Sequence, residues 1–128
     1  MNKLETLKSK FEAEVEKLKK LEKEKEKIIA IRHQLEGQKT ENQLVEEEFK
    51  HLKEDAVVYK LIGPVLVKQD FAEAQSNVEK RLEYITREIE RAEKQITSTD
   101  EKIATQTEAL TKSQATLKRE LAVAHTKA

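Results

Sequence analysis

The sequence contains no cysteine and no tryptophan, and only 1 proline and 2 glycines among 128 residues. Without cysteine, the chain can form no disulfide framework, no thiolate zinc site and no thiol nucleophile. A compact domain of this length usually carries more aromatic residues and more turn residues. The scarcity of both therefore indicates long helices interrupted by few turns, and not an ordinary globular core.

An excess of charge of either sign is also missing, because 25 Lys and Arg balance 25 Asp and Glu. Nucleic acids and anionic membrane surfaces attract basic proteins, so we expect neither as a partner. The N-terminus, Met1 to Glu5, contains no uninterrupted apolar run of the kind that a signal peptide or a spanning helix requires. We therefore expect a soluble, cytoplasmic protein.

No group of residues is typical of catalysis or of metal or cofactor binding. His33, His51 and His125 lie far apart in the sequence, without the spacing of metal ligands and without a nucleophile nearby. The acidic run Glu46–Glu48 has no evident pocket around it, and the sequence has no glycine-rich phosphate loop. We therefore predict that the chain is not an enzyme and needs no cofactor.

Two long segments, residues 1–55 and 70–128, carry apolar residues at steps of mostly three and four, which predicts coiled-coil helices. The expected stripe of the first segment is Leu4, Leu7, Phe11, Val15, Leu18, Leu21, Ile28, Ile31, Leu35, Val45, Phe49 and Leu52. That of the second segment is Phe71, Ala74, Val78, Leu82, Ile85, Ile89, Ala92, Ile96, Thr99, Ile103, Leu110, Leu117 and Leu121. The step from Phe11 to Val15 breaks a strict heptad, which indicates an imperfect register.

The polar residues Gln38, Asn42 and Gln43 interrupt the first stripe, and they either fix the register of the pair or weaken it locally. Asp70, with Glu73 after it, has the pattern of a helix N-terminus. Because the two helices have similar lengths, we expect them to pair antiparallel, so that four leucines meet at one end and Leu52 meets Phe71 at the other. The meeting leucines are Leu4, Leu7, Leu117 and Leu121.

Residues 56–69 have a different pattern, rich in β-branched residues around the chain's one Gly-Pro step. Two short strands joined at Gly63 and Pro64 predict a β-hairpin, in which Pro64 is tolerated at the start of the second strand. The predicted fold is thus mainly α, a long antiparallel two-helix coiled coil with one central β-hairpin.

This hairpin carries apolar residues on both faces, and its outer edges present unpaired backbone groups. Because a lone two-stranded hairpin is marginal in water, we expect it to be an assembly module that another sheet covers. The alternative is that it packs on the base of its own coiled coil. The residues expected at the subunit interface are Val57, Val58, Tyr59, Leu61, Ile62, Gly63, Pro64, Val65, Leu66 and Val67.

Several segments resemble the prefoldin family. The stretch Val58–Gln69, followed by Ala74 and Lys80–Ile85, is similar to the hairpin and the second-helix start of its beta-type subunits. Glu14–Lys17 and Thr40–Asn42 are similar to their first helix. The single hairpin matches the beta class, since alpha-type subunits carry two.

The resemblance implies a subunit of a heterohexameric chaperone, whose hairpins form a β-barrel platform built with other alpha- and beta-type subunits. Its coiled coils would bind unfolded proteins such as actin and tubulin and pass them, without ATP, to the cytosolic chaperonin. Client contacts would then fall on the helix ends, although ordinary seam packing explains the same residues. They are Leu4, Leu7, Phe11, Leu117 and Leu121. The alternative function is a structural coiled-coil adaptor, which predicts a stable homodimer.

Overall fold

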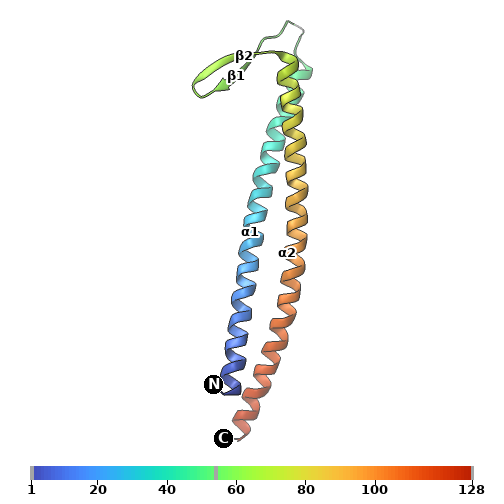
Figure 1. Cartoon of the computed structure of the whole chain (residues 1–128). Coiled ribbons are helices and arrows are strands. Elements are labelled where there is room, and N and C mark those ends of the chain that lie inside the picture. Colours follow the sequence, from blue (N-terminus) through green and yellow to red (C-terminus); the bar gives the residue numbers. More distant parts are fainter. Residues whose placement is uncertain (1, 54, 128) are drawn as a thin grey trace. The chain divides into compact units, whose positions relative to one another are not determined.

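The computed structural model describes residues 2–53 and 55–127. Its elements follow in the order α1 (Lys3–Lys50), β1 (Val58–Ile62), β2 (Val65–Gln69) and α2 (Phe71–Lys127), as Figure 1 shows. The chain divides into two compact units: a terminal unit, residues 1–30 with 94–128, and a hairpin unit, Ile31–Glu93. None of the described helices is apolar over a length sufficient to cross a membrane.

Both helices begin at a side-chain cap. The Asp70 carboxylate accepts a hydrogen bond from the Glu73 N–H at 3.1 Å, as the sequence predicts. The Asn2 amide oxygen does the same for the Glu5 N–H at 2.8 Å, a cap that the sequence pattern did not predict. Each cap satisfies one backbone donor that the first turn leaves unpaired, and such caps stabilise a helix by about 0.5–2 kcal/mol.

The first helix ends earlier than expected, at Lys50 and not near residue 55. The two N–H groups after it donate to carbonyls three residues back, which tightens and closes the last turn. The rings of Phe49 and Phe71 meet edge to face, with centroids 5.5 Å apart. The predicted pairing of Leu52 with Phe71 is therefore replaced by Phe49, and Leu52 lies exposed beyond the helix.

In the terminal unit the helices pair antiparallel through a strictly heptad seam. Lys3 of α1 forms an ion pair with Glu120 of α2, and Lys25 forms one with Asp100. Residue numbers thus rise along α1 as those of its partners fall along α2, as in an antiparallel pair. The partly buried α1 positions at this spacing are Leu4, Leu7, Phe11, Glu14, Leu18, Leu21, Lys25 and Ile28. On α2, Thr99 and Gln106 are buried, and the other positions are partly buried: Ile96, Ile103, Leu110, Ser113, Leu117 and Glu120.

Two expectations about this seam are wrong. The heptad is not broken after Phe11, because Glu14 occupies the next seam position and Val15 lies half-buried beside it. Leu121 is exposed, since Glu120 takes the seam position and pairs with Lys3. Apolar spacing alone missed both glutamates because charged side chains are rare at seam positions.

The hairpin unit has the same antiparallel pairing. Arg32 pairs with Glu93, and the Arg81 guanidinium donates to the Asn42 amide oxygen in an exposed contact, so Asn42 joins the two helices. The α1 seam here reads Arg32, Leu35, Lys39, Asn42, Glu46 and Phe49. It faces the mostly apolar α2 positions Phe71, Ala74, Val78, Leu82, Ile85, Ile89 and Ala92.

Ile31 and Val45 are exposed, so their predicted place in the seam is also wrong. The register that begins at Leu4 continues without interruption through Lys25 and Ile28 to Arg32. Placing Ile31 in the seam would need two successive steps of three residues, which overwinds a coiled coil. One continuous helix therefore keeps its phase, and a half-buried arginine takes the seam position in place of an isoleucine.

Candidate functional site

The turn of the hairpin follows from its two residues, Gly63 and Pro64. Ile62 pairs directly with Val65, which leaves a two-residue loop, and Gly63 has φ of 57°. Proline fixes its own φ near −65°, so Pro64 cannot adopt the positive φ that a type I′ turn needs at its second position. The turn is therefore of type II′, with glycine at the position that requires it. Pro64 lies in the loop, and β2 begins one residue later.

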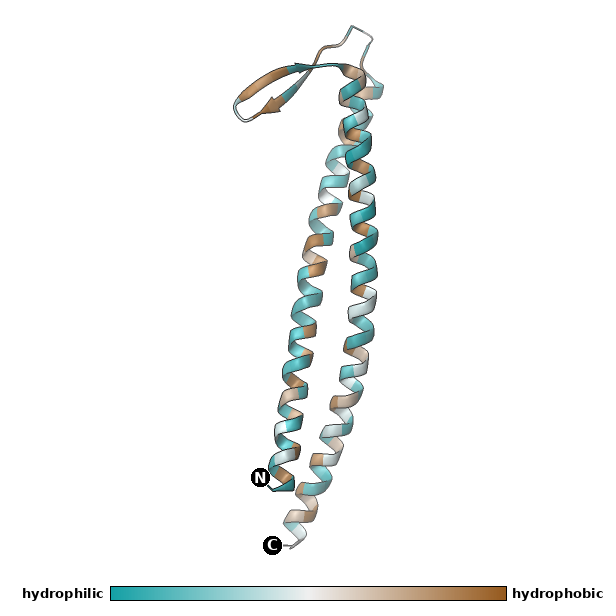
Figure 2. Cartoon of the chain, viewed as in Figure 1, coloured by the Kyte–Doolittle hydropathy of each residue, from teal (hydrophilic) through white to brown (hydrophobic). Residues whose placement is uncertain are grey.

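The register of β1 with β2 divides the hairpin into two faces, because directly paired residues point to the same side. One face carries Val58, Lys60, Ile62, Val65, Val67 and Gln69. The other carries Tyr59, Leu61, Leu66 and Lys68. Each face thus presents a cluster of large apolar side chains, and Figure 2 shows this hydrophobic colouring along both strands.

These side chains are open to solvent in the chain by itself. Leu61 is 68% exposed and Leu66 is 64% exposed. The other exposed members of the predicted interface are Val57, Tyr59, Ile62, Val65 and Val67. The structure therefore brings all ten predicted assembly residues onto one hairpin. Its described residues form a sheet of two strands alone, so each strand also has an unpaired outer edge.

The candidate client residues lie near the ends of the two helices, in the terminal unit. Leu4, Leu7, Phe11 and Leu117 are half-buried in the seam, so ordinary packing accounts for them in this conformation. Leu121 differs, since it is 44% exposed, and Val123 two residues later is exposed to a similar extent. Val123 falls outside the seam spacing, so the apolar pattern does not predict it as a client residue.

A polar layer lies beside these leucines. The Gln106 amide donates to the Glu14 carbonyl at 2.9 Å, and the Ser113 hydroxyl donates to the Glu14 carboxylate at 2.9 Å. The second carboxylate oxygen, Oε2, is buried without a hydrogen-bond partner among the described residues. A buried carboxylate oxygen without a partner destabilises its surroundings. The coiled coil is thus locally weakened within one heptad of Leu7 and Phe11.

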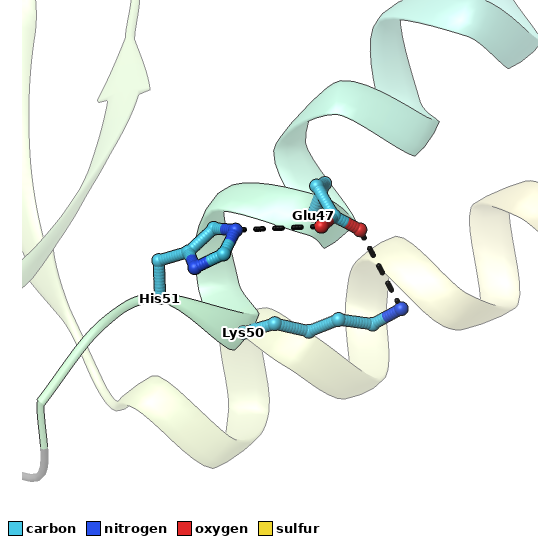
Figure 3. A network of polar contacts seen from close by, with 3 residues as sticks. All are labelled: Glu47, Lys50 and His51. Carbon is cyan, nitrogen blue, oxygen red and sulfur yellow. Dashed lines mark ion pairs between the residues drawn. The ribbon is translucent and has the colours of Figure 1, made fainter.

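The end of α1 carries the polar network of Figure 3. The two oxygens of the Glu47 carboxylate lie 3.6 Å from Lys50 Nζ and 3.3 Å from His51 Nε2. All three side chains are well exposed, so these pairs contribute little to stability. Across the described part of the chain, no cluster of three or more His, Cys, Asp or Glu side chains could hold a metal ion.

Comparisons with known proteins agree with this architecture. A family model described as prefoldin subunit matches residues 2–117. The chain is 44% identical over 115 residues to prefoldin subunit 6 of Homo sapiens, an alignment that covers 90% of this chain and 89% of that protein. It is 50% identical over 94 residues to probable prefoldin subunit 6 of Caenorhabditis briggsae, which covers 73% of each.

A solved structure extends the likeness to the fold. The prefoldin beta subunit from Thermococcus strain KS-1 matches with a TM-score of 0.73 and 22% identity, over 79% of this chain and 89% of that chain. The family resemblance inferred from Val58–Gln69 is confirmed, as is its beta type, and the matched relatives carry the name subunit 6. With a single apolar hairpin between two antiparallel helices and a family match along most of its length, the chain belongs to the prefoldin family.

Proposed function

We propose that this chain is a subunit of a heterohexameric, ATP-independent chaperone of the cytoplasm. In this proposal it binds unfolded or nascent proteins such as actin and tubulin and transfers them to the cytosolic chaperonin. Prefoldin is a family of chaperone subunits and not of enzymes, and its subunits form hexamers with one another. Beyond this family membership, our proposal names the clients, the transfer to the chaperonin and the cellular compartment.

The observation that carries the proposal is the hairpin with two exposed apolar faces. Burial of apolar surface contributes about 25 cal/mol per Å², so seven large exposed side chains leave a strong drive to associate. The two open strand edges can extend into a shared sheet with neighbouring hairpins. Neither feature has a use in a coiled coil that acts alone.

Client binding is supported by the chemistry of the helix ends. Leu121 and Val123 offer exposed apolar side chains, and the unpaired oxygen of Glu14 weakens the seam close by. Locally weak segments open more often than the rest of a structure. Several such ends in one hexamer would bind an unfolded chain through many weak contacts, which gives avidity and still permits release.

Light scattering on the chain with and without alpha-type partner subunits tests the assembly step. We expect a hexamer with the partners, and poor assembly without them. Val65→Asp with Val67→Asp should abolish the hexamer, because it places charge on one hairpin face. As a control, Lys60→Asp replaces one charged residue by another on the same face, and it should leave the hexamer intact. A stable homodimer of the isolated chain, unaffected by the valine changes, would instead support a structural adaptor.

A further inference from the structure

We propose that α1 carries a second seam in the hairpin unit, and that this seam binds a helix of a neighbouring prefoldin subunit. With Leu4 at heptad position a, the first seam uses positions a and d. Ile31 and Val45 fall at position g of α1 and are 55% and 42% exposed, whereas Leu52, 40% exposed, lies beyond the end of the helix. Gln38 fills the g position between the first two.

Position g changes character where the hairpin unit begins. In the terminal unit, every g position of α1 is charged: Lys3, Lys10, Lys17 and Glu24. In the hairpin unit, none of its three g positions, Ile31, Gln38 and Val45, is charged. Charged side chains are the usual occupants of an exposed flank. The change therefore marks the stretch of α1 beside the hairpin as a surface with a different use.

The spacing identifies the occupant as a helix. Together with Leu35, Asn42 and Phe49 at position d, the g residues form an unbroken alternation of steps of four and three. Such an alternation is the pattern that a helix presents to another helix in a coiled coil. Since α2 already occupies the side of d that faces position a, the side that faces g remains open to a third helix.

The charges of α1 support two seams instead of one badly filled seam. Arg32, Lys39 and Glu46 occupy half-buried a positions, while apolar residues stand immediately before Arg32 and Glu46 in the open. A helix with a single partner would be more stable with the apolar residues in the seam and the charged residues exposed. With a second partner helix, the g residues are covered too, and the long charged side chains lie between the two seams, where their ends reach water.

The surroundings favour a prefoldin neighbour as the source of the helix. The second seam ends with α1 at Lys50, and exposed apolar residues follow it at Leu52 and Val57, so the two surfaces are close along the chain. Since prefoldin subunits form hexamers, a neighbour joined at the hairpin would bring its own coiled coil beside α1. Glu41 and Glu48 flank the second seam, so the matching flank of the partner helix should be basic.

Subunit exchange in the reconstituted hexamer tests this inference. We compare Ile31→Gln with Val45→Gln against Tyr84→Gln, a control at an exposed apolar residue of α2 in the same unit. The isolated chains should melt alike, because these side chains are exposed. Native mass spectrometry of mixed labelled hexamers should show exchange about tenfold faster for the double variant alone. Equal exchange for wild type, variant and control would overturn the inference.

A photo-crosslinking residue at Val45 identifies what covers the seam. We expect a cross-link to a helix of another subunit in the hexamer. A cross-link to α2 of the same chain would mean that α1 turns to bury Val45 internally, and it would overturn the inference, as would the absence of any cross-link to another subunit. The inference rests on hexamer formation. Failure of the wild-type chain to assemble would overturn both proposals, whereas a normal hexamer without this contact overturns the second seam alone.

Discussion

Gly63 is the residue of the hairpin whose backbone requires glycine. It alone among the described residues has a positive φ, and a Cβ added there would meet no atom within 4 Å. A substitution is therefore opposed by backbone strain and not by crowding. The Gly-Pro step was visible in the sequence, but its turn type needed the strand register, because the same two letters also fit a longer loop.

Gly63→Ala should weaken hexamer assembly, because holding a residue other than glycine in such a sparsely populated conformation costs about 1–3 kcal/mol. The midpoint of dissociation in urea, followed by light scattering, measures this. Gly37→Ala is the matched control, since Gly37 lies inside α1 with open space around it. There the same change should stabilise the chain by up to about 1 kcal/mol. Equal effects of both substitutions on assembly would contradict the turn assignment.

Glu14 is the residue whose burial the sequence concealed. Leucine at this seam position removes the unpaired buried oxygen at the expense of the Ser113 hydrogen bond. We expect Glu14→Leu to raise the stability of the chain by about 1 kcal/mol. Thermal unfolding measures the change, and Glu12→Leu, at an exposed position, should leave the midpoint nearly unaltered. A lower midpoint for Glu14→Leu would show that the polar layer stabilises the seam.

At the scale of elements, the helices and the hairpin were predictable from the sequence, and the phase of α1 was not. Hydrophobicity favours Ile31 and Val45 over Arg32 and Glu46, and both sets fit a heptad because they share the residues between them. Which set occupies the seam depends on two factors that a local pattern does not contain. These are the register carried over from Leu4 and the partners that α2 supplies.

Those partners recur along α2 at heptad spacing. Asp100 pairs with Lys25 and Glu93 pairs with Arg32, but the next position toward the hairpin is Thr86, and it lines one groove with Lys39. Of the three cationic side chains at successive a positions of α1, Lys25 and Arg32 thus have a carboxylate partner on α2, and Lys39 shares its groove with Thr86. A carboxylate at position 86 would complete a third ion pair, with Lys39.

Thr86→Glu should supply this pair and stabilise the hairpin unit through Lys39 by about 0.2–1 kcal/mol. Because Glu83 and Glu90 on the same helix repel the new charge, the coupling is measured by a double-mutant cycle with Lys39→Gln. The coupling energy from urea unfolding should fall sharply in 1 M salt, where screening is strong. A coupling of zero at low salt would mean that the two side chains do not meet.

At the scale of the whole molecule, the two candidate sites can be separated by mutation. Leu4→Ser with Leu121→Ser should spare the hexamer, since neither residue lies on the hairpin. It should weaken the suppression of denatured-actin aggregation several-fold, because the exposed side chain of Leu121 and the half-buried apolar side chain of Leu4 are lost at the helix ends. Turbidity measures the suppression, with Thr6→Ser as a control on the same turn. Full protection by the double variant would contradict client binding there.

The surface that a copy exposes to solvent at its hairpin also depends on whether that copy is assembled. A copy within a hexamer would hide two apolar faces and two strand edges that an unassembled copy displays. Such exposed edges and apolar strands are templates for aggregation. Surplus chains would therefore be distinguishable by their surface alone, and the cell could match the supply of this subunit to that of its partners by removing whichever copies still show a bare hairpin.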